Sequence, residues 1–252
     1  MATIEILDPE NYFGKDLLIE LEKVRTFSLL PEKRIGWNYP LDYLFVLKEF
    51  EKFLSAHKGP SQALKIVDIG CGPGAIHGYI ESIFDVDIIG IDMHRWESDY
   101  VTIVGNFCSK KVRFQYDLMD LDLIISSSAF EHNRPSGHLK LVNECKKALN
   151  PEGGQLITTS AVCDGKTHHY SKSSQWNLSF SDVGLIYGHK PQNYKDYCQI
   201  YQRWKQSEIL VDGYMTRFPD QDSFAPSFLS LGYSGKASEL QPKRGIGFQW
   251  IF

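Results

Sequence analysis

Lys65-Ile66-Val67-Asp68-Ile69-Gly70-Cys71-Gly72-Pro73-Gly74-Ala75-Ile76 is the stretch of sequence that decides the fold. A short apolar run rich in β-branched residues carries an acid near its end, and three glycines at alternate positions follow. Apolar residues then recur at helical spacing, at Ile76, Tyr79, Ile80 and Ile83. A buried strand, a tight turn and a helix form the first βα unit of an open α/β sheet. Ligands of such sheets bind outside the carboxyl ends of the strands, where this turn lies.

The sequence of this turn is consistent with two kinds of ligand. The pattern Gly70-x-Gly72-x-x-Ala75 fits the dinucleotide fingerprint, in which a helix N-terminus receives a pyrophosphate. The same residues also form the pattern Asp68-x-Gly70-x-Gly72-x-Gly74. A carboxylate at Asp68 would repel a pyrophosphate but suits a ligand with an ammonium group and a nearby sulfonium. We therefore favour S-adenosylmethionine (SAM), and an NAD-dependent oxidoreductase is the alternative.

Composition excludes several classes of function. The 252 residues suffice for one large α/β domain with an elaboration, and the net charge of −4 comes without a Lys/Arg block, so no nucleic-acid partner is expected. We find no signal peptide and no apolar run of the ~18 residues that a membrane span needs. The five cysteines are scattered, which favours reduced thiols in the cytoplasm over disulfides or a bound metal. The oligomeric state cannot be inferred.

Four regions are expected along the chain: an N-terminal helical cap over residues 1–58, a ligand-binding core over 59–160, a lid or insertion over 161–208, and C-terminal strands over 209–252. The cap contains helical patterns at 17–30 and 40–54. Trp37 and Tyr39 precede the second of these helices. They either cover the ligand as a lid or pack to seat the helix on the sheet.

The core pattern predicts four further strands. The second, Asp87–Asp92, ends in an acid about twenty residues beyond the glycine turn, where a carboxylate can accept hydrogen bonds from both ribose hydroxyls of an adenosine. The alternative role of Asp92 is that of a helix cap or turn residue. The third is predicted at 112–117, ending in Asp117, although 100–104 also has strand character. The fourth covers 121–128, and the fifth covers 155–159 after the turn Asn150-Pro151-Glu152-Gly153-Gly154.

The strand and helix alternation is expected to stop after residue 160. The segment 161–190 is polar and rich in aromatic residues, and a connection of that length is usually a lid or binding loop. A helix is predicted at 194–207, and two late strands at 227–233 and 245–252, with 209–218 as a rival for the sixth strand. The expected fold is a doubly wound, mostly parallel α/β sheet of seven strands whose last strand is antiparallel.

Four motifs in this order resemble the class I SAM-dependent methyltransferases: Asp68-x-Gly70-x-Gly72-x-Gly74, Gly90-Ile91-Asp92, Asp117-Leu118 and Pro151-Glu152-Gly153-Gly154. The resemblance covers residues 64–159 and implies a Rossmann-like core that binds SAM and releases S-adenosylhomocysteine. It implies that Asp117 contacts the adenine amino group and that Leu118 packs beside the ring. The expected cofactor-binding residues are Asp68, Gly70, Cys71, Gly72, Gly74, Asp92, Met93, Asp117, Leu118, Ser127, Ser128, Trp37 and Tyr39.

The reaction expected from this resemblance is methyl transfer to an oxygen or nitrogen of a small polar acceptor, such as a sugar. A SAM-binding module without methyl transfer is a second alternative. If the nucleophile is a hydroxyl, a general base is needed, and the candidates are His132, His168 and His169. His132 follows the fourth strand and has a structural alternative as a supporting or capping histidine. His168 and His169 are neighbours that point apart, so at most one of them is expected to act.

Overall fold

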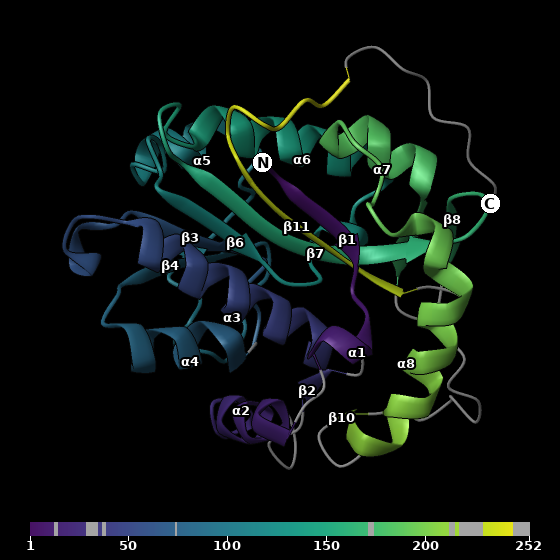
Figure 1. Ribbon diagram of the computed structural model, residues 1–252. Coiled ribbons are helices and arrows are strands. Elements are labelled where there is room, and N and C mark those ends of the chain that lie inside the picture. The colour runs from purple at the N-terminus through teal and green to yellow at the C-terminus, as the bar shows by residue number, and fades with distance from the viewer. Residues whose placement is uncertain are drawn as a thin grey trace.

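The computed structural model describes residues 1–12, 15–28, 35–36, 39–73, 75–170, 174–211, 215–216 and 229–243 (Figure 1). Its centre is a mixed sheet in the order β1-β11-β7-β6-β3-β4-β5. Five neighbouring strands are parallel, and β11 runs antiparallel to β7. Their bounds are β3 (Ile66–Ile69), β4 (Ile88–Asp92), β5 (Ile103–Val104), β6 (Leu123–Ser126), β7 (Gln155–Cys163) and β11 (Leu229–Lys236). The expected doubly wound sheet with an antiparallel last strand is thus confirmed.

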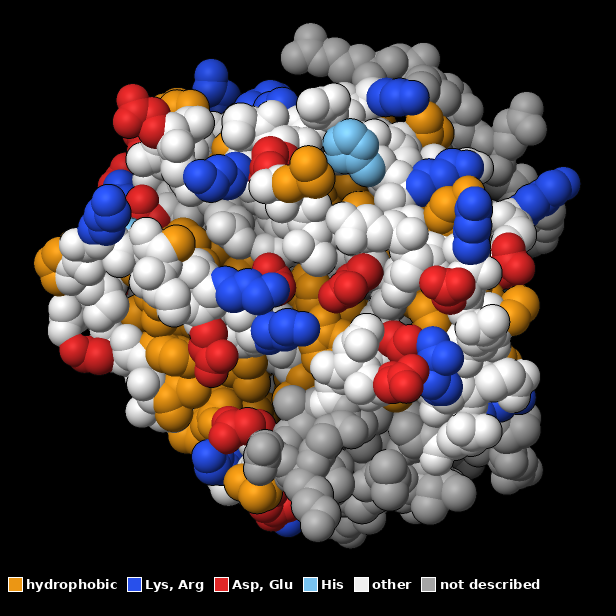
Figure 2. Space-filling view, in the orientation of Figure 1, with side chains coloured by type: hydrophobic (Ala, Val, Ile, Leu, Met, Phe, Trp, Pro, Cys, Tyr) orange, Lys and Arg blue, Asp and Glu red, His pale blue; other side chains and the backbone are white. Residues whose placement is uncertain are grey.

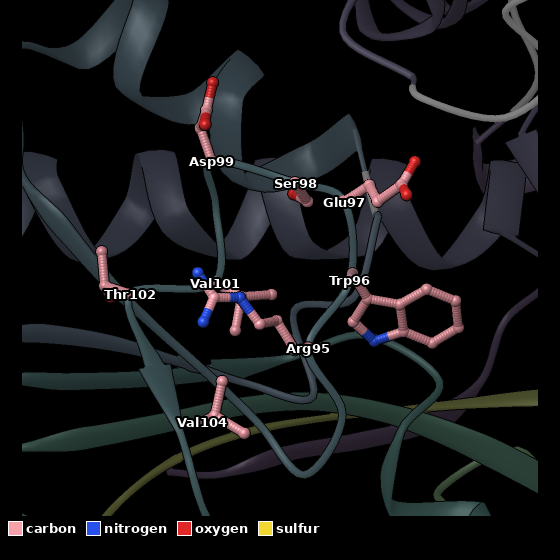
Figure 3. A pocket seen from close by; sticks show the side chains of 8 residues that line it. All are labelled: Arg95, Trp96, Glu97, Ser98, Asp99, Val101, Thr102 and Val104. Atoms are coloured by element: carbon pink, nitrogen blue, oxygen red, sulfur yellow. The ribbon is translucent and has the colours of Figure 1, made fainter.

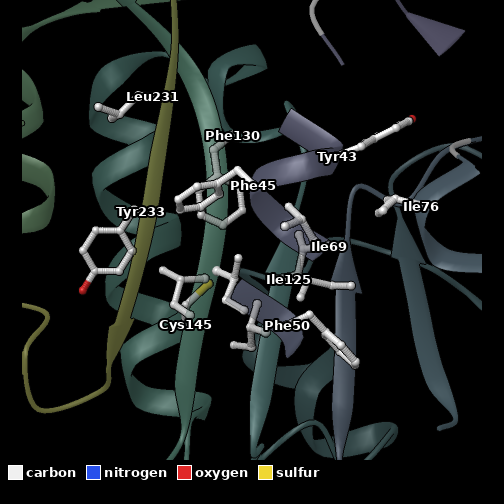
Figure 4. Packing of buried hydrophobic residues seen from close by; sticks show 14 of the residues in the cluster. Tyr43, Phe45, Phe50, Ile69, Ile76, Ile125, Phe130, Cys145, Leu231 and Tyr233 are labelled. Carbon is white, nitrogen blue, oxygen red and sulfur yellow. The ribbon is translucent and has the colours of Figure 1, made fainter. Parts of the chain in front are cut away.

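Helices cover both faces of the sheet. On one face lie α5 (Lys110–Gln115), α6 (Pro135–Ala148) and α7 (Phe180–Tyr187), and on the other lie α3 (Tyr39–Ala56) and α4 (Ala75–Phe84) (Figure 1). A further helix, α2 (Lys15–Thr26), packs on α4. Phe45 and Phe50 of α3 are fully buried, and α3 packs on β7 and β11 (Figure 4). Apolar burial on both faces holds the carboxyl ends of the strands in a fixed array.

The N-terminal segment, expected as a helical cap over residues 1–58, contains a strand as well as helices. It begins with a strand, β1 (Thr3–Ile6), which pairs antiparallel with β11 at the end of the sheet, and a short helix, α1 (Pro9–Tyr12), follows. The alternating burial of β1 places Ile4 and Ile6 in the core. The strand at the edge of the sheet, next to the antiparallel β11, is therefore β1 from the N-terminus. It does not come from residues 209–233. A strand of four residues has too few alternations to stand out in the sequence.

The C-terminal predictions have mixed outcomes. Instead of a sixth strand over 209–218, α8 (Tyr197–Val211) continues to residue 211, and β10 (Met215–Thr216) pairs with β2 (Ile35–Gly36) in a separate small sheet. The strand predicted at 227–233 is confirmed as β11. The strand predicted at 245–252 lies outside the described residues.

The third predicted strand is wrong. Residues 112–115 belong to the helix α5, and the strand is β5, which lies within the stretch that had strand character. Val112, Phe114 and Tyr116 alternate with polar residues as in a strand, but Phe114 on α5 and Tyr116 at its C-cap are exposed. As a result, Asp117 does not end a strand.

The described residues of the segment 161–208 include strands and helices. Strand β7 continues to Cys163, and β8 (His168–Tyr170) and β9 (Gln175–Ser179) form an antiparallel pair, of which β9 also pairs with the end of β7. Helix α7 follows and buries Val183, Ile186 and Tyr187, so much of the predicted lid is core. The helix predicted at 194–207 is confirmed by the 3-10 turn η4 (Tyr194–Asp196) and by α8.

Among the described residues, no helix is long and apolar enough to cross a membrane. On the face shown in Figure 2, acidic and basic side chains are interspersed, and an apolar area lies over α3 and α4.

Candidate functional site

The turn after β3 has the backbone that its glycines permit. Gly70 has φ +71° and Gly72 has φ +48°, in the left-handed region that residues with a Cβ rarely adopt. A Cβ built on Gly70 would lie 2.4 Å from Cβ of Ala129, in the segment that follows β6. The glycine turn and this segment are thus in close contact. Gly74 lies outside the described residues.

Asp68 is buried at the carboxyl end of β3 and faces a buried histidine of α4. His77 Nδ1 lies 3.5 Å from Asp68 Oδ2, and His77 Nε2 lies 3.5 Å from Glu81 Oε1. Burial alone would lower the pKa of His77, but the interaction with Asp68 and the Glu81 charge outweigh it, and the pKa is raised. The imidazole offsets part of the charge of Asp68. His77 gave no signal in the sequence because it lies among the apolar residues of the predicted helix.

Asp92 ends β4 directly beside the turn. Its Oδ2 accepts a hydrogen bond from the Gly72 N–H at 3.1 Å, and its Oδ1 accepts one from the His94 N–H at 2.9 Å. Asp92 is partly exposed, so its carboxylate can also meet a ligand. This geometry fits the turn role of Asp92 and leaves its ribose role as a prediction.

The loop after β4 folds back over the strand. A Cβ on Gly90 would lie 1.7 Å from the Tyr100 carbonyl oxygen, so only glycine allows this approach. Cys71 is buried there, with Sγ 3.5 Å from the same oxygen. Burial, and then the carboxylates of Asp68 and Asp92, raise the pKa of the Cys71 thiol, which makes it a packing group and a poor nucleophile.

Exposed apolar side chains gather at the same edge. Met93 is 65% exposed and Trp96 is 43% exposed. The Trp96 indole lies beside the turn, since a Cβ on Gly72 would be 3.7 Å from Trp96 Nε1. Large apolar side chains left open at the carboxyl edge suit a flat ligand group. Trp96 was missed because the sequence pattern between residues 94 and 111 is poor.

A hollow of about 620 Å³ adjoins Trp96 at the β4 and β5 edge (Figure 3). Glu97 and Asp99 point away from the Arg95 guanidinium in this view. The hollow is lined by Arg95, Trp96, Glu97, Ser98, Asp99, Val101, Thr102 and Val104.

The segment after β6 closes the other side of the turn. Ser126 Oγ donates a hydrogen bond to the Ile69 carbonyl oxygen at 2.7 Å, which ties β6 to the end of β3. Ser127 Oγ is buried and makes no hydrogen bond within the described residues. Ser128 is buried, with φ +50°. Ser127 and Ser128 thus lie between Ser126, which bonds Ile69, and Ala129, which contacts Gly70, and their contact with a ligand stays a prediction.

Asp117 and Leu118 lie elsewhere, which corrects their expected contact with the ligand. Asp117 Oδ2 accepts a hydrogen bond from Lys65 Nζ at 2.7 Å, and Lys65 immediately precedes β3. The pair therefore marks the amino edge of the sheet, opposite to the glycine turn. Leu118 is buried in the core. The error follows from the third strand, because an acid placed at the end of a strand would have lain at the carboxyl edge.

The three candidate histidines come from neighbouring elements, the turn η3 (Phe130–His132) and the β8–β9 pair, since β9 packs on η3. His132 is exposed, and its Nδ1 lies 3.3 Å from the Ser174 carbonyl oxygen. His169 is exposed beside Trp176, with ring centroids 5.0 Å apart.

His168 has partners at both ring nitrogens. Nδ1 lies 3.2 Å from the Lys166 carbonyl oxygen, and Nε2 lies 3.1 Å from Asn177 Nδ2. Cys163 Sγ lies 3.7 Å from Nδ1, but burial raises the pKa of this thiol to about 12. His168 is therefore held as a structural residue of the β8–β9 pair. Trp37 and the side chain of Tyr39 lie outside the described residues.

Comparisons with known proteins concern the fold. No protein-family model matches the sequence, and a search of curated proteins found no relative. Among solved structures, geranyl diphosphate C-methyltransferase from Streptomyces coelicolor is 12% identical with a TM-score of 0.47, over 94% of this chain and 92% of that one. The cyclopropane synthase MmaA2 from Mycobacterium tuberculosis is 13% identical with a TM-score of 0.45, over 84% and 93%. The [4+2]-cyclase SpnF is 13% identical with a TM-score of 0.47, over 91% and 96%.

Within the described ranges, no three His, Cys, Asp or Glu side chains are grouped so that they could hold a metal ion.

Proposed function

We propose that the protein is a SAM-dependent methyltransferase. The observation that supports this most is the arrangement at the carboxyl edge, where the buried Asp68 and the partly exposed Asp92 flank a glycine turn with left-handed backbone at Gly70 and Gly72. Two acids beside an open backbone suit a cationic ligand with a ribose and disfavour a pyrophosphate.

In this proposal the adenosine part of SAM lies over the loop that follows β4. Asp92 accepts hydrogen bonds from the ribose hydroxyls, and the exposed Met93 and Trp96 cover the adenine ring. The hydrogen-bonding role first given to Asp117 passes to Asn106, which is exposed and follows β5 at the correct edge. Asp68 attracts the ammonium group from beneath the turn.

When bound, SAM supplies an electrophilic methyl group on a sulfonium. The protein then has to align the acceptor behind the methyl carbon, and such positioning can contribute ~7–11 kcal/mol. The proposed acceptor is a small polar molecule, such as a sugar, that presents an oxygen or nitrogen. This choice rests on the polar and aromatic side chains of the β8–β9 pair.

His132 is the strongest candidate for a general base. If its Nδ1 carries the proton, Nδ1–H donates to the Ser174 carbonyl oxygen, and the lone pair stays on Nε2. No described residue hydrogen-bonds to Nε2, and the side chain is exposed beside the segment after β6. His168 lacks this freedom because both of its nitrogens are engaged.

Calorimetric titration with S-adenosylhomocysteine, with NADH in parallel, tests the cofactor. Micromolar binding of the first and none of the second is the expected result. NADH binding alone would refute the methyltransferase proposal and revive the dinucleotide reading of Gly70-x-Gly72-x-x-Ala75. A turnover assay with SAM across pools of small acceptors then separates an enzyme from a SAM-binding module without methyl transfer.

A further inference from the structure

A buried acid that the sequence analysis did not single out stands next to the proposed site. Asp42 lies in the first turn of α3 and is fully buried. The Ser128 hydroxyl after β6 donates a hydrogen bond to Asp42 Oδ2, and the hydroxyls of Thr159 in β7 and Ser230 in β11 lie close enough to lower the pKa of the Asp42 carboxyl group. None of these three groups carries a charge.

Ser128 connects this acid to the backbone of the site. Its Oγ donates to Asp42 Oδ2, and its N–H donates to Thr159 Oγ1 at 3.0 Å. With φ +50°, Ser128 adopts a conformation that costs a residue with a Cβ free energy and that persists only where the surroundings fix it. The hydrogen bonds from Ser128 to Asp42 and Thr159 hold the Ser128 backbone in this conformation.

Ala129, which follows Ser128, links the position of the Ser128 backbone to the glycine turn. Ala129 is in contact with Gly70, as the 2.4 Å approach of a Cβ built there shows. The preceding residue, Ser127, has a buried hydroxyl with no hydrogen bond inside the described part of the chain. A shift in the backbone of Ser128 would therefore move both Ser127 and the residue that packs on the turn.

We propose that Asp42 is a positioning residue that acts through Ser128 to hold the 127–129 segment against the glycine turn, in the form that receives the ligand. The inference rests on the proposed function only for the identity of that ligand. This positioning role explains why a carboxyl group lies among hydroxyl groups here, although an apolar residue would avoid the free-energy cost of burying a polar group.

The protonation state of Asp42 adds a dependence on pH. Burial raises the pKa of Asp42 from 3.8 to about 7, although the hydrogen bonds from Ser128, Ser230 and Thr159 oppose the rise. Between about pH 4 and pH 7, Asp42 therefore holds a proton in the folded protein that it loses in the unfolded chain. The stability that the neutral form gives is complete below pH 4 and is lost as the pH rises to about 7.

Hydrogen exchange of the ligand-free protein tests the positioning role without any assumption about the ligand. We expect Asp42→Ala to speed amide exchange in the 124–131 peptide by roughly tenfold or more, and Asp42→Asn, which keeps hydrogen bonds to the hydroxyls, to remain close to wild type. Glu49→Gln is the matched control, because Glu49 is a buried acid of the same helix that pairs with Lys52. Equal exchange in wild type and Asp42→Ala would overturn the proposal.

Two further readouts separate positioning from a general loss of fold. The melting temperature of Asp42→Asn minus that of wild type should increase from pH 4.5 to 7.5 and level off above, and a difference that is flat with pH would contradict the buried proton. Affinity for S-adenosylhomocysteine should fall about tenfold in Asp42→Ala and recover in Asp42→Asn at pH 6. If wild type does not bind this ligand, the proposed function fails, while the exchange result still decides the role of Asp42.

Discussion

Single side chains at the carboxyl edge differ in what they do for the fold and for the ligand. Asp92 is partly exposed, and its carboxylate accepts hydrogen bonds from two backbone N–H groups of the adjoining turn and loop, so its loss should disturb the fold little. We expect Asp92→Ala to weaken binding of S-adenosylhomocysteine by about 10- to 100-fold, the cost of removing hydrogen bonds to a charged acceptor. Calorimetry and a thermal melt measure both effects.

The control for Asp92 is Asp99→Ala, which removes an equal charge from the same loop. A similar loss of affinity in Asp99→Ala would show a general electrostatic effect in place of ribose recognition.

His132 and His168 make a paired prediction about catalysis. If a hydroxyl is methylated, His132→Gln should reduce kcat by roughly 10²- to 10⁴-fold, the usual contribution of a general base. His168→Gln should act mainly on stability, because the imidazole bonds Lys166 and Asn177 within the β8–β9 pair. Steady-state rates with a thermal melt separate the two, and an unchanged kcat in His132→Gln would show that positioning alone suffices.

At the scale of elements, local pattern predicted those whose burial shows in their own sequence. β3, β4, β6 and β7 are buried runs, and the glycine turn carries its own signal. The third strand was misplaced because Phe114 and Tyr116 alternate but are exposed. Asp42 was missed for another reason, since its role depends on neighbours distant in sequence.

Helix α7 allows a direct test of how its start is fixed. Ser179 Oγ accepts a hydrogen bond from the Asp182 N–H at 3.1 Å, an N-cap contact. We expect Ser179→Ala to lower the free energy of unfolding by about 1 kcal/mol, measured by denaturant titration. Ser109→Ala is the control, because Ser109 occupies the N-cap of α5 without such a side-chain bond. Equal losses would mean that the Ser179 cap contributes nothing specific.

At the scale of the whole molecule, the sheet is completed by joining the two ends of the chain. β1 lies at the N-terminus and pairs with β11 near the C-terminus, and β11 in turn pairs with β7. Pairing between segments so far apart cannot be read from local periodicity, and this is why the sequence suggested a helical cap instead. Because β11 also carries Ser230, which bonds Asp42, the N-terminal strand supports an element that reaches the proposed site.

The contribution of β1 can be measured with one buried residue. Ile6 is fully buried, whereas Ile19 of α2 is 55% exposed. Ile6→Ala should lower the free energy of unfolding by about 2–5 kcal/mol, from lost burial and the cavity left behind, and Ile19→Ala by less than about 0.5 kcal/mol. If β1 is an integral part of the sheet, Ile6→Ala keeps one cooperative transition at lower denaturant concentration. A separate early transition would instead show that β1 detaches while the rest of the sheet stays folded.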